Sequence, residues 1–166
     1  MVVSRPCQIL ATVVARSWQP ASGIVHTRNN NEGGHMSERT DECAVGRYLA
    51  AIEQARMGDC DVLNPDVLLD ATVPNWRYSV RGNEAVRTEL SRWYGNAGTF
   101  EELTRTELPS GELVEFSLRW EEDGIPHAVH QAHILEVADG LIIRDQVWCG
   151  GRWSATLLAE MAESSA

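Results

Sequence analysis

The sequence of 166 residues contains no lysine, and all 14 of its basic residues are arginine. This absence excludes enzymes that form a Schiff base through lysine, and phosphate sites built on a Walker-type lysine. The basic residues face 24 acidic residues, which gives a formal net charge of -10. A field of this sign repels phosphate backbones and anionic lipid headgroups, so we expect neither nucleic acid nor a membrane to be a partner.

Cysteines are few and scattered, and long apolar runs are missing. The cysteines form no CxxC pair, so they match neither a zinc ribbon nor a redox motif. We expect isolated reduced thiols in a cytoplasmic protein that holds no metal or other cofactor. No apolar run approaches the roughly 18 residues that a membrane-spanning helix needs. The four cysteines are Cys7, Cys43, Cys60 and Cys149.

The first 36 residues differ in composition from the rest of the chain. They carry few fixed charges and include the polar run RNNNEGGH. We expect a disordered extension or a spurious one that precedes a natural start at Met36. A signal peptide built on CQILATVVA is the alternative. Residues 37–155 are expected to form one domain with a real core, followed by a helical tail over residues 156–166.

A helical period begins near Asp41 and predicts a helix that packs against the core. This helix is expected to start at Asp41, whose side chain would cap it, and to end at Gly58. A short second helix is predicted over NPDVLL, because Pro65 suits the first position of a helix. A third helix is predicted over NEAVRTELSRWYG, with Gly95 at its end. The core-facing positions would be Val45, Tyr48, Leu49, Ile52 and Ala55 in the first helix and Val86, Leu90, Trp93 and Tyr94 in the third.

The second half of the chain changes to the period of a strand. Pro74 confines an earlier strand, in ATVPNWRYSV, to a sheet edge or a bulge. The turn sequences PSG, DG and DG then join four further segments as antiparallel hairpins. Helices followed by such a meander predict an α+β domain with helices on one face of an antiparallel sheet. The four predicted strands are Thr99 to Leu108, Glu112 to Glu122, His127 to Val137 and Leu141 to Cys149.

This order of elements resembles the nuclear transport factor 2-like superfamily over about Asp41 to Trp153. The segments that carry the resemblance are LLDATVPNWRYSVRGNEAVRTEL and ILEVADGLIIRDQVW. The superfamily includes the SnoaL-like polyketide cyclases, the ketosteroid isomerases and the limonene epoxide hydrolases. The resemblance implies a curved antiparallel sheet wrapped around helices, a cystatin-like α+β barrel with a cone-shaped cavity. We expect a homodimer that forms through the outer sheet face. The resemblance does not imply one reaction, because this fold hosts enzymes and non-catalytic domains alike.

The catalytic residues of two enzyme groups in this superfamily are matched only in part. Ketosteroid isomerases place a base aspartate just before a proline, and the acid is missing before Pro74. Limonene epoxide hydrolases use an arginine between two aspartates, for which Arg119, Glu121 and Asp145 could stand. Their water-holding tyrosine and asparagine correspond here to Asp70 and Thr72.

Asp145 is the candidate general acid or base. Its strand neighbours of the same parity, Ile143, Val147 and Cys149, are apolar, so the carboxylate is expected to point toward the interior. A carboxylate in an apolar cavity has a raised proton affinity and suits acid or base catalysis. The alternative is a structural aspartate that binds a backbone amide or pairs with Arg119.

The segment GIPHAVHQAH holds three histidines within seven residues, which raises the question of a metal site. Strand alternation sends His130 to one face and His127 and His133 to the other. The latter two would be roughly 20 Å apart, too far to bind one zinc ion. We expect His133, with Gln131 beside it, to reach Asp145 and shuttle a proton. The alternative is a hydrogen-bonded histidine without catalytic function, and His127 is expected to be solvated.

Tryptophans are numerous and are expected to surround one cavity. Aromatic walls with few polar groups are typical of a pocket for a small hydrophobic molecule. Alternatively, the indoles fill the cavity, and the domain is a non-catalytic dimerisation or interaction module. An open cavity that contains Asp145 would favour the pocket, and a packed interior would favour the module. In CGGRW, two glycines would let Arg152 fold over the pocket mouth or a partner. The predicted ligand-binding residues are Trp76, Trp93, Trp120, Trp148, Arg119 and Gln131.

Overall fold

The computed structural model describes residues 43–164 and contains a six-stranded sheet with three α-helices. Predicted features of residues 1–42, including the extension and the Asp41 cap, lie outside the described residues. The elements are α2 (Ala44–Glu53), the 3-10 helix η1 (Met57–Asp59), β1 (Leu63–Val73), β2 (Trp76–Arg81), α3 (Asn83–Trp93), β3 (Gly98–Leu108), β4 (Gly111–Glu122), β5 (Ile125–Ala138), β6 (Leu141–Cys149) and α4 (Ala155–Ser164).

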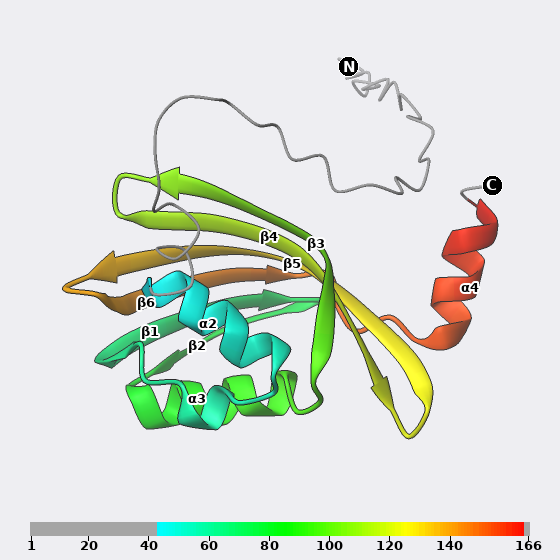
Figure 1. Cartoon of the computed structure of the whole chain (residues 1–166), viewed down its shortest axis with the longest axis horizontal. Coiled ribbons are helices and arrows are strands. Elements are labelled where there is room, and N and C mark those ends of the chain that lie inside the picture. The colour runs from blue at the N-terminus through cyan, green and yellow to red at the C-terminus, as the bar shows by residue number, and fades with distance from the viewer. Residues whose placement is uncertain (1–42, 165–166) are drawn as a thin grey trace, which may run out of the picture.

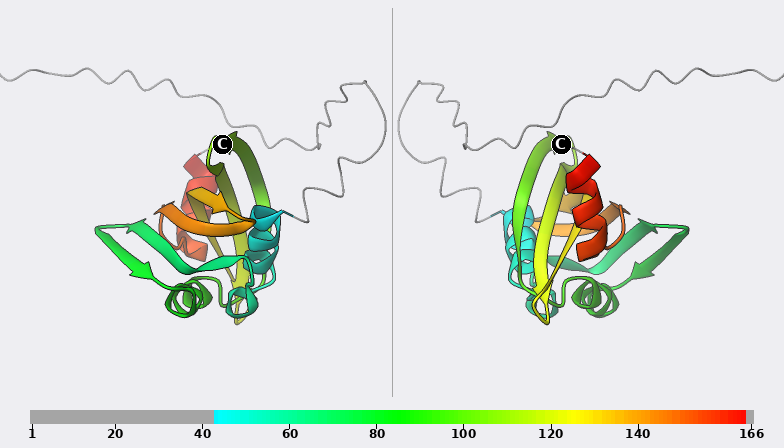
Figure 2. Two further views of the ribbon diagram at one scale, coloured as in Figure 1. Left: turned by 90° about the vertical axis from the view of Figure 1, so that its left-hand side faces the viewer. Right: turned by 90° about the vertical axis from the view of Figure 1, so that its right-hand side faces the viewer.

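The sheet is curved and open, with the strand order β2-β1-β6-β5-β4-β3. Strands β3 to β6 form the predicted antiparallel meander, whereas β1 pairs with β6 in parallel. Figure 1 shows α2 and α3 on one side of the sheet, and α4 apart from them at the right of the view. The two views of Figure 2 show the sheet bending around α2 and α3. This is the predicted α+β architecture, a curved sheet around helices, although the sheet does not close into a barrel.

Two of the predicted hairpin turns have the geometry that their Asp-Gly sequences favour. Asp123 and Gly124 join β4 to β5, and Asp139 and Gly140 join β5 to β6. All four residues have positive φ, between 51° and 76°. Two consecutive residues with positive φ make the tight turn whose twist matches that of the flanking strands. These turns fix which residues of β5 stand opposite those of β4 and β6.

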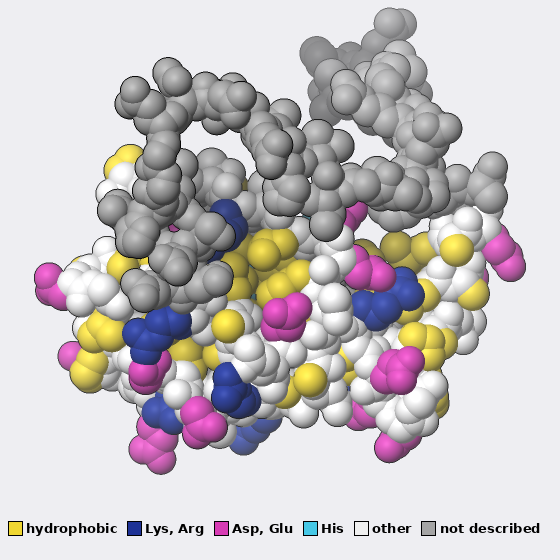
Figure 3. Space-filling model, viewed as in Figure 1, with side chains coloured by type: hydrophobic (Ala, Val, Ile, Leu, Met, Phe, Trp, Pro, Cys, Tyr) yellow, Lys and Arg dark blue, Asp and Glu magenta, His cyan; other side chains and the backbone are white. Residues whose placement is uncertain are grey.

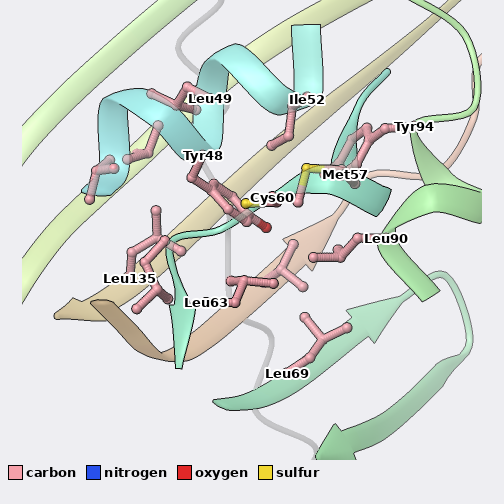
Figure 4. Packing of buried hydrophobic residues seen from close by; sticks show 14 of the residues in the cluster. Tyr48, Leu49, Ile52, Met57, Cys60, Leu63, Leu69, Leu90, Tyr94 and Leu135 are labelled. Carbon is pink, nitrogen blue, oxygen red and sulfur yellow. The ribbon is translucent and has the colours of Figure 1, made fainter. Parts of the chain in front are cut away.

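Side chains from α2 and α3 fill the hollow of the sheet. The predicted stripe of α2 is buried at Val45, Tyr48, Leu49 and Ile52. Figure 4 shows Tyr48 and Ile52 of α2 and Leu90 of α3 reaching into one cluster with side chains of the sheet. The inward residues of β4 alternate as predicted, since Val114, Phe116 and Leu118 are buried between outward polar residues.

The prediction of a short helix over NPDVLL is wrong, because these residues belong to β1. Asn64 accepts a hydrogen bond from the backbone N–H of Asp66 (2.9 Å), a local turn where the pairing of β1 with β6 is irregular. From Val67 onward buried and partly exposed residues alternate, which is the period of a strand. The turn at Asn64 and Pro65 therefore interrupts a strand and does not begin a helix.

The first helix also ends earlier than predicted. It finishes at Glu53, and Ala55 adopts a left-handed conformation with φ 54°. This conformation stops the helix before Gly58, which lies within η1. Ala55 therefore does not continue the buried stripe. The start of the helix is capped by Cys43, whose Sγ accepts a hydrogen bond from the N–H of Gly46.

The surface mixes charges of both signs. On the face shown in Figure 3, acidic and basic side chains lie among one another and around apolar ones. Within residues 43–164, no helix is long and apolar enough to cross a membrane.

Candidate functional site

Three buried polar side chains lie on the inner face of the sheet. Gln131 and His133 come from β5 and Asp145 from β6, and each is at most 2% exposed. All three face inward because residues two apart on a strand share a face, and the flanking Val129, Leu135 and Val147 of these strands are buried too. Polar groups at this depth need hydrogen-bond partners, which sets their arrangement.

Asp145 accepts hydrogen bonds at both carboxylate oxygens. His133 Nδ1 lies 2.9 Å from Oδ1, and the Tyr48 hydroxyl donates to Oδ2 over 2.6 Å. Tyr48 reaches this carboxylate from α2, across the hollow of the sheet. The group is therefore a buried Tyr–Asp–His triad assembled from one helix and two strands.

His133 is held in place by ring stacking as well as by its contact with Asp145. The imidazole stacks on Phe116 with centroids 5.3 Å apart and an interplanar angle of 18°. With a proton on Nδ1 facing the carboxylate, Nε2 of a neutral ring carries a free lone pair. Nε2 is buried and has no hydrogen-bond partner among residues 43–164. An orphaned nitrogen of this kind is available to a ligand or to a water molecule.

Tyr48 is fixed as a hydrogen-bond donor. Burial, reinforced by the negative charge of Asp145, raises the pKa of its phenol well above the ordinary value. Burial and the same carboxylate raise the pKa of Tyr94 as well. Both phenols are therefore neutral at physiological pH.

A pocket of about 360 Å³ opens beside this triad. It lies where the end of α3 meets the ends of β1, β4 and β6 and the middle of β5. Two tryptophans, Trp93 and Trp120, contribute to its lining. Its buried polar floor is formed by Tyr94, whose hydroxyl donates to Oε1 of Gln131 over 2.6 Å. The pocket thus combines aromatic surface with one hydrogen-bonded polar pair.

The triad lies behind the pocket floor. His133 follows Gln131 by two residues on the inner face of β5, yet neither His133 nor Asp145 is among the lining residues. A pocket is present, but it does not contain Asp145, which is enclosed in the packed interior, so the cavity expected for the ligand-binding interpretation is found only without its carboxylate. The buried polar groups that a molecule in this pocket would meet are Tyr94 and Gln131.

Among the described residues, no group of three or more histidine, cysteine, aspartate or glutamate side chains is arranged to hold a metal ion. The three histidines are separated as their alternation predicts. His130 is exposed and lies 2.9 Å from the Ser117 hydroxyl, whereas His127 and His133 face inward. His127 is not solvated as expected, because it stacks on Trp120 and its side chain is 12% exposed.

Solved structures share this arrangement of strands and helices, although no protein-family model and no curated protein matches the sequence. A proposed isomerase from Bacillus subtilis aligns with a TM-score of 0.55 and 16% identity, over 79% of this chain and 98% of its own. A nuclear transport factor 2-like protein from Anabaena variabilis aligns with a TM-score of 0.54 and 14% identity, over 73% and 96%. The chain has a nuclear transport factor 2-like fold.

A third structure with the nuclear transport factor 2-like fold is an epoxide hydrolase of the LEH-like type from M. tuberculosis. It aligns with a TM-score of 0.50 and 20% identity, over 64% of this chain and 79% of its own. The arginine and acid expected from that resemblance are not brought to Asp145 here. Arg119 pairs with Glu101 on the surface at 2.9 Å, and Glu121 is exposed. Asp70 lies on the outer face and binds Arg77.

The nuclear transport factor 2-like fold brings together some of the predicted site residues and separates others. Asp145 and His133 are in direct contact, and Gln131, Trp93 and Trp120 line the neighbouring pocket. Trp76 on the edge strand β2 is 68% exposed, and Trp148 on the outer face of β6 is 41% exposed. Neither they nor Arg119 line the pocket.

The sequence predicts Tyr48 and Tyr94 only as core positions of two helices. Their hydroxyls bind Asp145 and Gln131, which makes them part of the polar arrangement. The available signal was their position on a buried stripe, because a buried tyrosine usually finds a partner for its hydroxyl. The identity of the partner depends on tertiary packing.

Proposed function

We propose that this protein binds a flat, apolar small molecule in the pocket lined by Trp93 and Trp120. The observation that carries the proposal is the pocket itself. Its volume lies in the range of small-molecule sites, its walls include two indoles, and its floor offers the Tyr94–Gln131 pair to orient one polar group. The fold is compatible with this function but does not require it.

We also propose that the buried triad transfers a proton to or from the bound molecule. Asp145 holds His133 in one tautomer and would stabilise the imidazolium that forms when Nε2 takes up a proton. Tyr48 supports the charge on Asp145 through its 2.6 Å hydrogen bond. Proton abstraction next to a carbonyl, as in isomerisation or cyclisation, is the chemistry that such a base serves.

A non-catalytic dimerisation or interaction module is the competing function. It is favoured by one observation: Asp145 and His133 are enclosed by packed side chains. In that case Tyr48, His133 and Asp145 are a structural network. Binding and exchange measurements separate the two functions.

The binding proposal is tested by titrating the protein with 2-naphthamide in a calorimeter. We expect saturable binding that Trp120→Leu weakens and that Trp76→Leu leaves unchanged, because the second indole is 68% exposed and is not part of the pocket lining. Absence of binding, or equal loss in both variants, would contradict the pocket as the site.

The proton-transfer proposal is tested with 1-tetralone, a flat ketone, in deuterated buffer. We expect the protein to accelerate exchange of the protons beside the carbonyl, and His133→Gln to reduce that acceleration by about a hundredfold or more. Binding of 1-tetralone without faster exchange would contradict catalysis and favour the competing function.

A further proposal concerns the oligomer. Trp148 projects from the outer face of the sheet, where it pairs in register with Thr72 of β1 and Ala132 of β5. An indole with 41% of its surface exposed favours burial against another surface. We propose that this outer face forms the contact of a homodimer.

A further inference from the structure

Two arginine side chains line the pocket of this acidic protein. The charged residues of the pocket lining are Arg92 from α3, Arg152 from the segment after β6, and Glu122 from the end of β4. Two arginines against one acid give this site a net charge of +1, whereas the whole chain has a formal net charge of -10. Each of the two guanidinium groups is paired with a carboxylate, Arg92 with Glu89 and Arg152 with Glu122.

Arg152 lies where a bound aromatic molecule would meet it. Its guanidinium carbon stands 5.7 Å from the centre of the Trp120 ring, which is a cation–π contact. The same guanidinium donates to a ring nitrogen of His127 over 2.9 Å and to Glu122. Contact with the Trp120 ring places the guanidinium beside the apolar wall of the pocket.

The present partners of both arginines are replaceable. The side chain of Arg152 is 52% exposed and that of Glu122 is 40% exposed. Arg92 pairs with Glu89 at 3.2 Å, and its side chain is 73% exposed. Exposed ion pairs of this kind contribute little to stability, so a ligand anion can take the place of the carboxylate of Glu122.

We propose that the molecule bound in this pocket is an aromatic carboxylic acid, whose carboxylate is held by Arg152. The inference rests on the proposed binding function and names its ligand class. The planar guanidinium matches a carboxylate through two parallel hydrogen bonds, while Trp93 and Trp120 provide surface for the ring. Glu122 competes with the ligand for Arg152 and repels its negative charge.

The test compares 2-naphthoate with 2-naphthamide, which has the same rings but no charge, by calorimetric titration of the full chain. Wild-type protein is expected to bind the acid more tightly than the amide. Arg152→Gln should weaken binding of the acid by about tenfold or more, and should weaken it much more than it changes binding of the amide. Glu122→Gln should strengthen binding of the acid, because it frees the guanidinium.

Matched controls are Arg47→Gln and Asp61→Asn. Arg47 on α2 and Asp61 in the loop after η1 form another exposed ion pair, and neither residue lines the pocket. Their substitutions therefore change the charge as Arg152→Gln and Glu122→Gln do, but away from the pocket. Equal affinities for the acid and the amide would overturn the inference, and so would equal effects of Arg152→Gln and Arg47→Gln on binding of the acid. In either case, binding of the amide would still support the pocket as a binding site. If neither compound bound, the binding function itself would be contradicted.

Discussion

At the scale of single residues, Asp145 connects the buried polar side chains of the interior. It accepts from Tyr48 and His133, two donors that make no other hydrogen bond within residues 43–164. We predict that Asp145→Ala lowers the free energy of unfolding by about 3–5 kcal/mol, because it leaves both donors buried and unpaired. Urea unfolding followed by tryptophan fluorescence measures this loss. Asp61→Ala, at an exposed site, serves as control, and an equally small effect of both would contradict the buried pair.

The tyrosines predict how stability changes at alkaline pH. Burial raises the pKa of Tyr48 and Tyr94, and burial with the hydrogen bond to Glu89 raises that of Tyr78 to about 12. Tyrosines of the unfolded chain lose their protons near about pH 10. Above that pH the unfolded state binds fewer protons than the folded state, so stability is fully present below it and falls as pH rises.

Because the chain has no lysine, this decline is not masked by lysine titration in the same range. Tyr48→Phe should make the decline in unfolding free energy between about pH 9 and 11 shallower. The measurement is a series of urea midpoints across that range. A decline as steep as that of the parent protein would show that Tyr48 does not titrate as its burial requires.

At the scale of elements, period and turn chemistry were sufficient for the four strands of the meander and for α3. The meander and α3 follow from alternation, Asp-Gly turns and a helical stripe. NPDVLL could not be assigned in this way, because Asn64 and Pro65 suit a helix start and a strand irregularity equally well. Only pairing of β1 with β6, a contact between distant segments, decides between them.

Strand alternation also determines which residues of the site can be predicted from the sequence. It places Asp145 inside, and it sends Trp148, three residues further along β6, to the outer face. The prediction that Trp148 lines the cavity did not take this alternation into account. The partners of Tyr48 and Tyr94 were beyond prediction, since Tyr48 meets Asp145 across 97 residues of chain.

The hairpin between β5 and β6 provides a test at this scale. Gly140 has φ 75°, and a Cβ built on it would meet no atom within 4 Å. Gly140→Ala should therefore cost only the backbone strain, about 1–2 kcal/mol of unfolding free energy. Gly95→Ala is the control, since its Cβ would make an ordinary 3.5 Å contact without positive φ. Equal thermal midpoints of the two variants would argue against the left-handed turn.

At the scale of the whole molecule, the two faces of the sheet have separate functions in this account. The inner face holds the triad and the pocket, and the outer face carries Trp148. We predict a dimer in sedimentation equilibrium that Trp148→Glu converts to monomer, because a charge would be buried in the contact. Trp76→Glu, on the exposed edge strand, should leave the dimer intact. A wild-type monomer at micromolar concentration would contradict the proposed contact.

The pocket beside the triad is the binding site that we propose for this protein. The most direct measurement is a crystal structure of the protein purified from its own host. We expect density for a flat molecule against Trp93 and Trp120, with a polar atom near the Tyr94–Gln131 pair. A pocket closed by inward movement of those two indoles, with no ligand density, would contradict the proposed site.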